Sequence, residues 1–246
     1  MAERRERILV TGGAGFIGSH LVDLLLERPG AEVVVLDKLT YAGTGLNVAH
    51  HEPNPRFRFV LGDVADPDAV APLVGEADRV IHAAAESFVD RSIEDSRAFV
   101  LSNVLGTQVV LEACRELETP MLFVSTDEVY GSNRREWLYV RDFVRAIEAV
   151  MDNGEPGTVY NIGGGTELTN LDLAKRVCAF LGADGSLISF VEDRPGHDLA
   201  YGVRWDRLEA LGWRPATPFT DGLVTTLNWY RDHQDWVGEI LAGARA

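Results

Sequence analysis

One stretch constrains this chain more than any other: residues 11–18, which read Thr-Gly-Gly-Ala-Gly-Phe-Ile-Gly. An apolar strand over 8–10 precedes it, and an apolar helix over 16–26 follows it. Glycines in this arrangement allow a tight turn, a close approach of the backbone to a pyrophosphate, and close packing of the helix on the strand. The free N–H groups of the helix N-terminus then face the phosphates. The stretch therefore predicts a dinucleotide-binding turn, with its glycines at Gly12, Gly15 and Gly18.

An acidic residue, Asp37, ends the next apolar strand, which covers 32–36. A carboxylate at this distance from the glycines accepts hydrogen bonds from the hydroxyls of an adenosine ribose. Its charge would repel a 2′-phosphate, so we expect NAD rather than NADP, although Lys38 beside it weakens that preference a little. A glycine-rich turn without a ligand is the alternative that this strand, helix and acid disfavour.

Strands and helices alternate through the first half of the chain, and this alternation predicts a parallel sheet covered on both faces. We expect an α/β fold, a Rossmann-like doubly wound parallel sheet with a small C-terminal substrate-binding lobe. The predicted boundary separates an NAD-binding domain over 1–132 from a reduced C-terminal region over 133–246, which holds one sheet strand and the lobe. The expected strands are 8–10, 33–36, 57–61, 80–83 and 121–125, then 137–140 and 159–162. The expected helices are 16–26, 67–74, 92–117, 141–151, 170–181 with Asn170 as its cap, and 222–236.

The charge and the cysteines exclude several classes of function. The formal net charge of −15 argues against nucleic acid and against an anionic membrane as partners, because both attract a basic surface. Cys114 and Cys178 lie in apolar helical patterns without nearby ligand residues, so we expect two core residues, no disulfide and no metal site. Without an apolar leader or an apolar run of membrane-spanning length, the chain is expected to be cytoplasmic.

Several longer motifs resemble the dTDP-glucose 4,6-dehydratase family, of the extended short-chain dehydrogenase/reductase class. They cover nearly the whole chain. The motifs are the glycine turn, Leu-Asp-Lys-Leu-Thr-Tyr-Ala-Gly at 36–43, His-Ala-Ala-Ala-Glu-Ser at 82–87, Asn-Val-Leu-Gly-Thr at 103–107, Ser-Thr-Asp-Glu-Val-Tyr-Gly at 125–131, Tyr-Asn-Ile-Gly-Gly-Gly at 160–165 and Asp-Arg-Pro-Gly-His-Asp at 193–198.

The resemblance implies an internal hydride cycle on a nucleotide sugar: NAD takes hydride from C4, water leaves across C5 and C6, and the hydride returns to C6. On this pattern Thr126 bonds the C4 hydroxyl, Asp127 protonates the leaving C6 hydroxyl and Glu128 takes the C5 proton. Two adjacent carboxyls suit this division, because unequal burial separates their pKa values. A polar strand end without a catalytic role is the alternative reading of the acidic pair.

The resemblance also assigns binding residues, with NAD as cofactor and a nucleotide sugar as substrate. The cofactor-binding residues are Gly12, Gly15, Phe16, Ile17, Gly18, Asp37, Lys38, Asp63, Val64, Ala83, Ala84 and Ser125. The substrate-binding residues are Glu86, Ser87, Arg194 and His197. Asn103 is expected to support the site from a helix.

The match breaks after Gly131. Members of this class carry a Tyr-x-x-x-Lys pair, whose tyrosinate removes the C4 proton, and none of the six tyrosines of this chain has a lysine four places later. The family's long segment with this pair is missing between Gly131 and Arg135. Two explanations stay open, an in-frame deletion or a longer protein whose printed sequence omits this segment. A homodimer is implied by the family, but the usual interface helix belongs to the missing segment.

Three functions are compatible with these observations. The first is a dTDP-glucose 4,6-dehydratase-type lyase, with slow or absent turnover if the segment is truly deleted. The second is a catalytically impaired homologue that binds NAD and a sugar nucleotide, and the third is an epimerase or decarboxylating relative. The Asp127–Glu128 pair after threonine disfavours the third.

Overall fold

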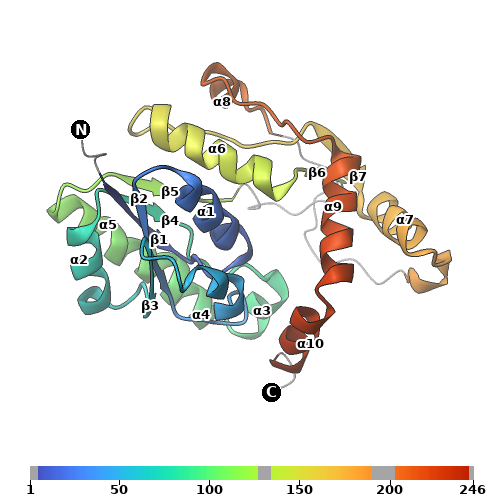
Figure 1. Ribbon diagram of the computed structural model, residues 1–246, viewed down its shortest axis with the longest axis horizontal. Coiled ribbons are helices and arrows are strands. Elements are labelled where there is room, and N and C mark those ends of the chain that lie inside the picture. The colour runs from blue at the N-terminus through green and yellow to red at the C-terminus, as the bar shows by residue number, and fades with distance from the viewer. Residues whose placement is uncertain (1–4, 127–133, 190–202, 244–246) are drawn as a thin grey trace. The chain divides into compact units, whose positions relative to one another are not determined.

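The computed structural model describes residues 5–126, 134–189 and 203–243. The chain divides into two compact units, Met1–Ser125 and Thr126–Ala246 (Figure 1). The first unit holds the glycine turn and the acid after the second strand, so it carries the predicted cofactor site.

The first unit is built on a five-stranded sheet whose neighbouring strands are all parallel. The strand order is β3-β2-β1-β4-β5, so the chain adds strands on one side of β1 and then crosses to the other side. Because the direction in which strands are added reverses at β1, the sheet is doubly wound. This confirms the predicted fold class. The strands are β1 (Glu6–Thr11), β2 (Ala31–Asp37), β3 (Phe57–Leu61), β4 (Arg79–His82) and β5 (Met121–Phe123).

Helices cover both faces of this sheet. Figure 1 shows α2 and α5 on one side of the strands and α1 on the other. The helical segments of the unit are α1 (Phe16–Glu27), the short η1 (Gly45–Asn47) and η2 (Ala49–His51), α2 (Pro67–Glu76), α3 (Val89–Glu94), α4 (Ser96–Phe99), the π-helical η3 (Val100–Gly106) and α5 (Thr107–Glu116).

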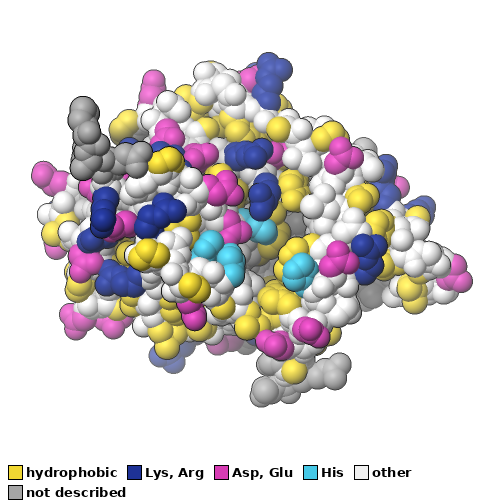
Figure 2. Space-filling model, viewed as in Figure 1, with side chains coloured by type: hydrophobic (Ala, Val, Ile, Leu, Met, Phe, Trp, Pro, Cys, Tyr) yellow, Lys and Arg dark blue, Asp and Glu magenta, His cyan; other side chains and the backbone are white. Residues whose placement is uncertain are grey.

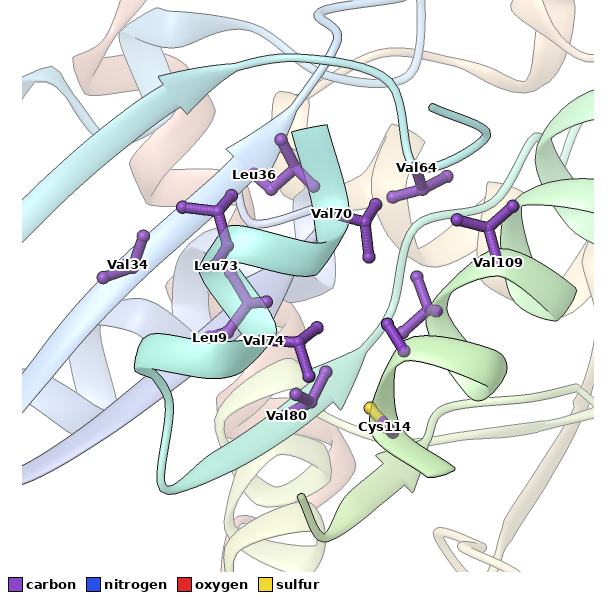
Figure 3. Packing of buried hydrophobic residues seen from close by; sticks show 12 residues of the cluster. Leu9, Val34, Leu36, Val64, Val70, Leu73, Val74, Val80, Val109 and Cys114 are labelled. Carbon is purple, nitrogen blue, oxygen red and sulfur yellow. The ribbon is translucent and has the colours of Figure 1, made fainter. Parts of the chain in front are cut away.

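The strands are apolar at consecutive positions because alternate side chains enter two different cores. Leu9 and Val34 point to the face covered by α2 and α5, where twelve buried residues form one cluster (Figure 3). The intervening Ile8 and Val33 are also fully buried, on the opposite face. The expectation of a core on both faces is thus confirmed.

The long helix predicted over 92–117 is interrupted. Asp95 leaves the helical region with φ −139° and ψ 84°, and its carboxylate accepts from the N–H of Arg97 in the new helix α4, which begins at Ser96. A capping acid inside an otherwise helical pattern thus restarts the helix. The π-helical segment that follows turns Ser102 and Asn103 towards the cofactor side of the unit, as described below.

The second unit contains helices and a two-stranded antiparallel sheet. A small apolar cluster forms around Ala146, Leu208 and Trp213. Asp142 is buried on α6, where its carboxylate accepts from the N–H groups of Ala216 and Thr217. The elements are β6 (Arg134–Trp137), α6 (Val140–Asn153), β7 (Thr166–Thr169), α7 (Asn170–Leu181), η4 (Gly185–Leu187), α8 (Asp206–Ala210), α9 (Phe219–Asp232) and α10 (Gln234–Gly243).

Five sequence expectations for the second unit are wrong. Residues 159–162 do not form a strand, and Val159 is 73% exposed; the second strand is β7, which follows the glycines. The first strand ends at Trp137 rather than beginning there. Thr169, not Asn170, caps α7, because its hydroxyl accepts from the N–H of Asp172. The terminal helix divides at His233 into α9 and α10. Cys178 is only partly buried, whereas Cys114 lies in the core as expected.

Several apolar side chains of the first unit are exposed. β5 is an edge strand of the five-stranded sheet, and Phe123 on it is 47% exposed. Val100 and Val104, from the π-helical segment, are 55% and 63% exposed. Among the described residues no strand pairs with the outer edge of β5, and natural sheets usually cover such an edge.

Candidate functional site

The glycine turn joins β1 to α1 with no space for larger residues. Gly12 has φ +73°, and a Cβ there would lie 2.6 Å from the Cα of Ala84. A Cβ on Gly18 would lie 2.1 Å from the carbonyl oxygen of Gly12. Gly15 precedes α1, and no side chain caps the helix or places an acid in its first turn. The first N–H groups of α1 therefore remain available to an anion.

Asp37 ends β2 beside this turn. One carboxylate oxygen accepts from the N–H of Ala14 at 3.0 Å, and the other accepts from the N–H of Leu39 at 2.9 Å. Two main-chain donors fix the carboxylate and leave each oxygen with lone pairs for a further donor. This arrangement suits the two hydroxyls of a ribose at the end of the strand.

Lys38 links the ends of three strands. Its amino group donates to the hydroxyl of Ser102 and lies 3.5 Å from a carboxylate oxygen of Asp63 and 3.7 Å from Oε1 of Glu86. Asp63 also accepts from the N–H of Ala65, which fixes the turn after β3. The structure thus brings together three residues that sequence analysis placed separately at the cofactor and the substrate.

Glu86 is buried, and its Oε2 has no hydrogen-bond partner among the described residues. Its backbone is held by Asn103, whose amide oxygen accepts from the N–H of Glu86 and whose amide nitrogen donates to its carbonyl. An unsatisfied buried carboxylate oxygen costs free energy, which a ligand hydroxyl would recover. Asn103 was predicted to support the site from a helix, and its two hydrogen bonds to the backbone of Glu86 are consistent with that role.

His82 supports the sheet behind the site. Its Nδ1 pairs with the hydroxyl of Thr11 at 2.6 Å, and its Nε2 pairs with the hydroxyl of Thr107 at 3.0 Å. Burial lowers the pKa of His82 to about 4, so the ring is neutral near pH 7. The N–H of Ala83 donates to the carbonyl of Thr11 and that of Ala84 to its hydroxyl. These bonds hold the end of β4 against the glycine turn.

The remaining predicted residues fall into three groups. Phe16 and Ile17 occupy the first turn of α1, and Val64 is buried in the core next to Gly106. Ser87, Ser125 and Thr126 are exposed, the last two directly after the strand end of β5. Four predicted residues lie outside the described ones: Asp127, Glu128, Arg194 and His197.

Sequence reasoning missed Tyr41 and Ser102. Burial raises the pKa of the Tyr41 hydroxyl, and the neighbouring Glu86 carboxylate raises it further. The ring of Tyr41 lies under the guanidinium of Arg91, 3.9 Å from its centroid, and beside Phe88. Tyr41 lies in the motif Leu-Thr-Tyr-Ala-Gly at 39–43, and that motif could have indicated its place near the site. No sequence motif indicated Ser102.

Two family profiles match this chain. The profile described as GDP-mannose 4,6 dehydratase matches residues 9–136, and that of the NAD dependent epimerase/dehydratase family matches residues 131–163. The two matches meet at 131–136, where sequence analysis located the missing segment.

Curated relatives and solved structures agree with these profiles. A dTDP-glucose 4,6-dehydratase from Streptomyces niveus is 37% identical, and the alignment covers 94% of each chain. The low-salt glycan biosynthesis protein Agl12 of Haloferax volcanii is 35% identical over 91% of this chain and 98% of its own. A dTDP-glucose 4,6-dehydratase from Streptomyces venezuelae, crystallised with NAD, is 35% identical with a TM-score of 0.90, covering 94% of this chain and 98% of that one.

The alignment with the Streptomyces niveus protein spans 316 residues, which exceeds the 246 residues of this chain. That relative therefore has internal residues without a counterpart here, as expected from the missing Tyr-x-x-x-Lys segment. The motifs, the doubly wound sheet and the shared identity over nearly the full chain lead to one conclusion: this chain belongs to the dTDP-glucose 4,6-dehydratase family.

Proposed function

We propose that the first unit binds NAD across the carboxyl ends of β1, β2 and β4, and that the chain is a dTDP-glucose 4,6-dehydratase. The observation that carries the cofactor assignment is the carboxylate of Asp37, fixed by the N–H groups of Ala14 and Leu39 beside an uncapped helix N-terminus. NAD supplies a hydride acceptor for C4 of the sugar and returns that hydride at C6. The family's activity and the relative crystallised with NAD support this assignment.

The cofactor residues have separate tasks in this proposal. The N–H groups at Phe16 and Ile17, in the first turn of α1, bind the pyrophosphate. Asp37 accepts from the adenosine ribose hydroxyls, and its charge excludes a 2′-phosphate. Asp63 and Val64 border the adenine. Ala83 and Ala84 have small side chains, so the dinucleotide can lie close to their backbone. Gly12, Gly15, Gly18, Lys38 and Ser125 complete the proposed set.

Two substrate contacts are assigned to residues of the same unit. Glu86 is already buried with one oxygen unpaired, so it is suited to accept from a hydroxyl of a bound sugar nucleotide. Ser87 follows it and is exposed. For the diphosphate we assign Arg194, which can pair with phosphate oxygens in a bidentate manner, and His197.

Three consecutive residues carry the proposed chemistry. Thr126 donates to or accepts from the C4 hydroxyl, Asp127 holds the proton that the departing C6 hydroxyl takes, and Glu128 removes the proton from C5. The absence of a Tyr-x-x-x-Lys pair leaves the C4 proton without the family's usual base. If the segment is truly deleted, slow or absent turnover is expected, because an unperturbed tyrosine with a pKa of about 10 is a poor base near neutrality.

The decisive experiment measures two quantities on one preparation. NAD binding is followed by calorimetry, and conversion of dTDP-glucose is followed by mass spectrometry of the 4-keto-6-deoxy product. Binding together with product supports the full proposal. Binding without product at high protein concentration would contradict the dehydratase activity and assign the chain to the impaired homologues. Failure to bind NAD would overturn the cofactor site itself.

Substrate range is tested in the same assay with UDP- and GDP-sugars as competitors. A preference for dTDP-glucose supports the proposed substrate. Epimerised product from a UDP-sugar would instead favour the epimerase relatives.

A further inference from the structure

Three of the six histidines of this chain gather around one carboxylate in the first unit. Nε2 of His51 lies 2.7 Å, and Nε2 of His50 lies 3.0 Å, from the same oxygen of Asp23. Nδ1 of His20 lies 3.8 Å from the other oxygen. Figure 2 shows histidine side chains in adjoining patches on the displayed face, next to acidic groups. Neither the cofactor nor the substrate assignment uses this cluster.

Two well-anchored elements hold the cluster. His20 and Asp23 are one turn apart on α1, so their side chains share a face of the helix. His50 and His51 end η2. The segment before η2 is fastened by the buried Val48, and the amide of Asn47 donates to the carbonyl of Ala14 at 2.8 Å.

The residues around Asp23, His50 and His51 hold these side chains in a defined geometry. The His51 side chain is 15% exposed and that of Asp23 is 29% exposed. The rings of His50 and His51 are 3.9 Å apart between centroids, and the ring of His51 also lies 5.5 Å from that of Phe57. Packed rings keep both Nε2 atoms directed at the same carboxylate.

The donor set matches a borderline divalent cation. Imidazole nitrogen and carboxylate oxygen are zinc ligands, and one donor atom from each of Asp23, His50 and His51 lies within 4.8 Å of the others. Zinc–ligand distances of about 2.0–2.1 Å require donors about 3.3 Å apart in a tetrahedron. The present separations of 2.7 and 3.0 Å reach that value with a small opening of partly exposed side chains.

We propose that Asp23, His50 and His51 bind a Zn²⁺ ion, with water in the fourth position. The ion would join α1 to the segment that carries η2, and so stabilise the folded first unit by mass action. The competing explanation is that both imidazoles simply donate Nε2–H to the carboxylate without any ion. No metal site was expected from the sequence, in which Asp23 lies far from His50 and His51.

Metal-free, untagged protein is titrated with ZnCl₂ by calorimetry, and its thermal unfolding is recorded with and without Zn²⁺. The expected result is one Zn²⁺ per chain and a higher melting temperature with Zn²⁺, whereas Mg²⁺, which prefers oxygen ligands, gives no such rise. Co²⁺ in place of Zn²⁺ should give visible absorption bands that Zn²⁺ removes.

Two variants remove a ligand and one serves as a control. Asp23→Asn and His50→Gln should each weaken Zn²⁺ binding by at least about tenfold and abolish the thermal shift. His50 has a side chain that is 57% exposed, so its variant keeps the fold even where Asp23→Asn does not. His233→Gln, on the exposed end of α9, should bind Zn²⁺ like the unaltered chain.

Absence of Zn²⁺ binding to the unaltered chain would overturn the proposal in favour of the hydrogen-bonded cluster. Binding that persists in both ligand variants, or that is lost in His233→Gln, would also overturn it, because the ion would then lie elsewhere. None of these readouts depends on NAD or on dehydratase activity.

Discussion

The two units of this protein are stabilised in different ways. In the first, consecutive apolar residues of parallel strands enter cores on both faces, and twelve buried residues form one of them. In the second, Ala146, Leu208 and Trp213 form a smaller cluster, Val144, Ile147 and Met151 on α6 are also buried, and the buried carboxylate of Asp142 ties α6 to the segment at 216–217. The comparison teaches that the first unit packs its apolar residues on both faces of one sheet, whereas the second packs a smaller described cluster around α6 and α8 and adds a buried carboxylate to it.

The first unit also has a sheet edge, formed by β5, at the place where the family's further segment would continue. The family's missing segment contains the strand that follows this edge and the helix that follows that strand, according to the resemblance. Phe123 and Val104 are exposed among the described residues of the first unit.

A pair of matched leucine substitutions gives the largest expected effects. Leu9 and Leu208 are both fully buried, the first in the large cluster and the second in the small one. Leu9→Ala should cost about 3–5 kcal/mol, and Leu208→Ala about 2–3 kcal/mol, because fewer buried neighbours surround the second cavity.

Urea unfolding, with hydrogen exchange to resolve the two units, measures both costs. Leu208→Ala should leave NAD affinity unchanged, since Leu208 is outside the cofactor unit. Equal costs in the two variants would contradict the difference drawn between the units.

Gly12→Ala tests the tight turn of the first unit. The positive φ and the approach of a Cβ to the backbone of Ala84 predict a loss of about 3 kcal/mol in the free energy of unfolding, together with loss of NAD binding. Gly45→Ala is the matched control, because a Cβ there meets nothing within 4 Å. NAD affinity that survives Gly12→Ala would remove the turn from the proposed cofactor site.

The buried His82 predicts a pH dependence for the first unit. Its pKa is about 4 in the folded chain and about 6.5 when unfolded, so the unfolded state binds the proton more readily between these values. Stability should therefore be complete above pH 6.5 and fall by up to about 3 kcal/mol as the pH drops towards 4.

His82→Gln can still bond the hydroxyls of Thr11 and Thr107 but does not titrate. Its unfolding free energy should start lower at pH 7 and change less between pH 6.5 and 4. A slope equal to that of the unaltered chain would show that other groups cause the acid sensitivity.

Asp37→Asn gives the smallest of the expected effects on binding energy. Removal of the charge should weaken NAD binding by about 10- to 100-fold, as for a lost hydrogen bond to a charged group. It should also reduce the preference for NAD over NADP, because the repulsion of a 2′-phosphate is gone. Calorimetry with both cofactors measures this, and Asp68→Asn, in the exposed first turn of α2, is the control.

Much of the first unit could be predicted from the sequence because its signals are local. The glycine turn, the apolar strands and the acid after β2 lie within short stretches whose spacing is fixed by backbone geometry. The β7 strand and the Thr169 cap were missed because short polar strands and neighbouring caps have weak patterns. The interruption at Asp95 was missed because a capping acid also occurs inside helices.

The sequence by itself determined the family, the doubly wound parallel sheet and the glycine turn that we propose binds NAD, since each follows from motifs that bring their own local structure. Only the tertiary structure decided which side chains meet: the main-chain donors that orient Asp37, the burial of Glu86 with an unpaired oxygen, and the histidines around Asp23. These contacts join residues from separate elements. Packing sets their distances, and no spacing within a single stretch encodes them.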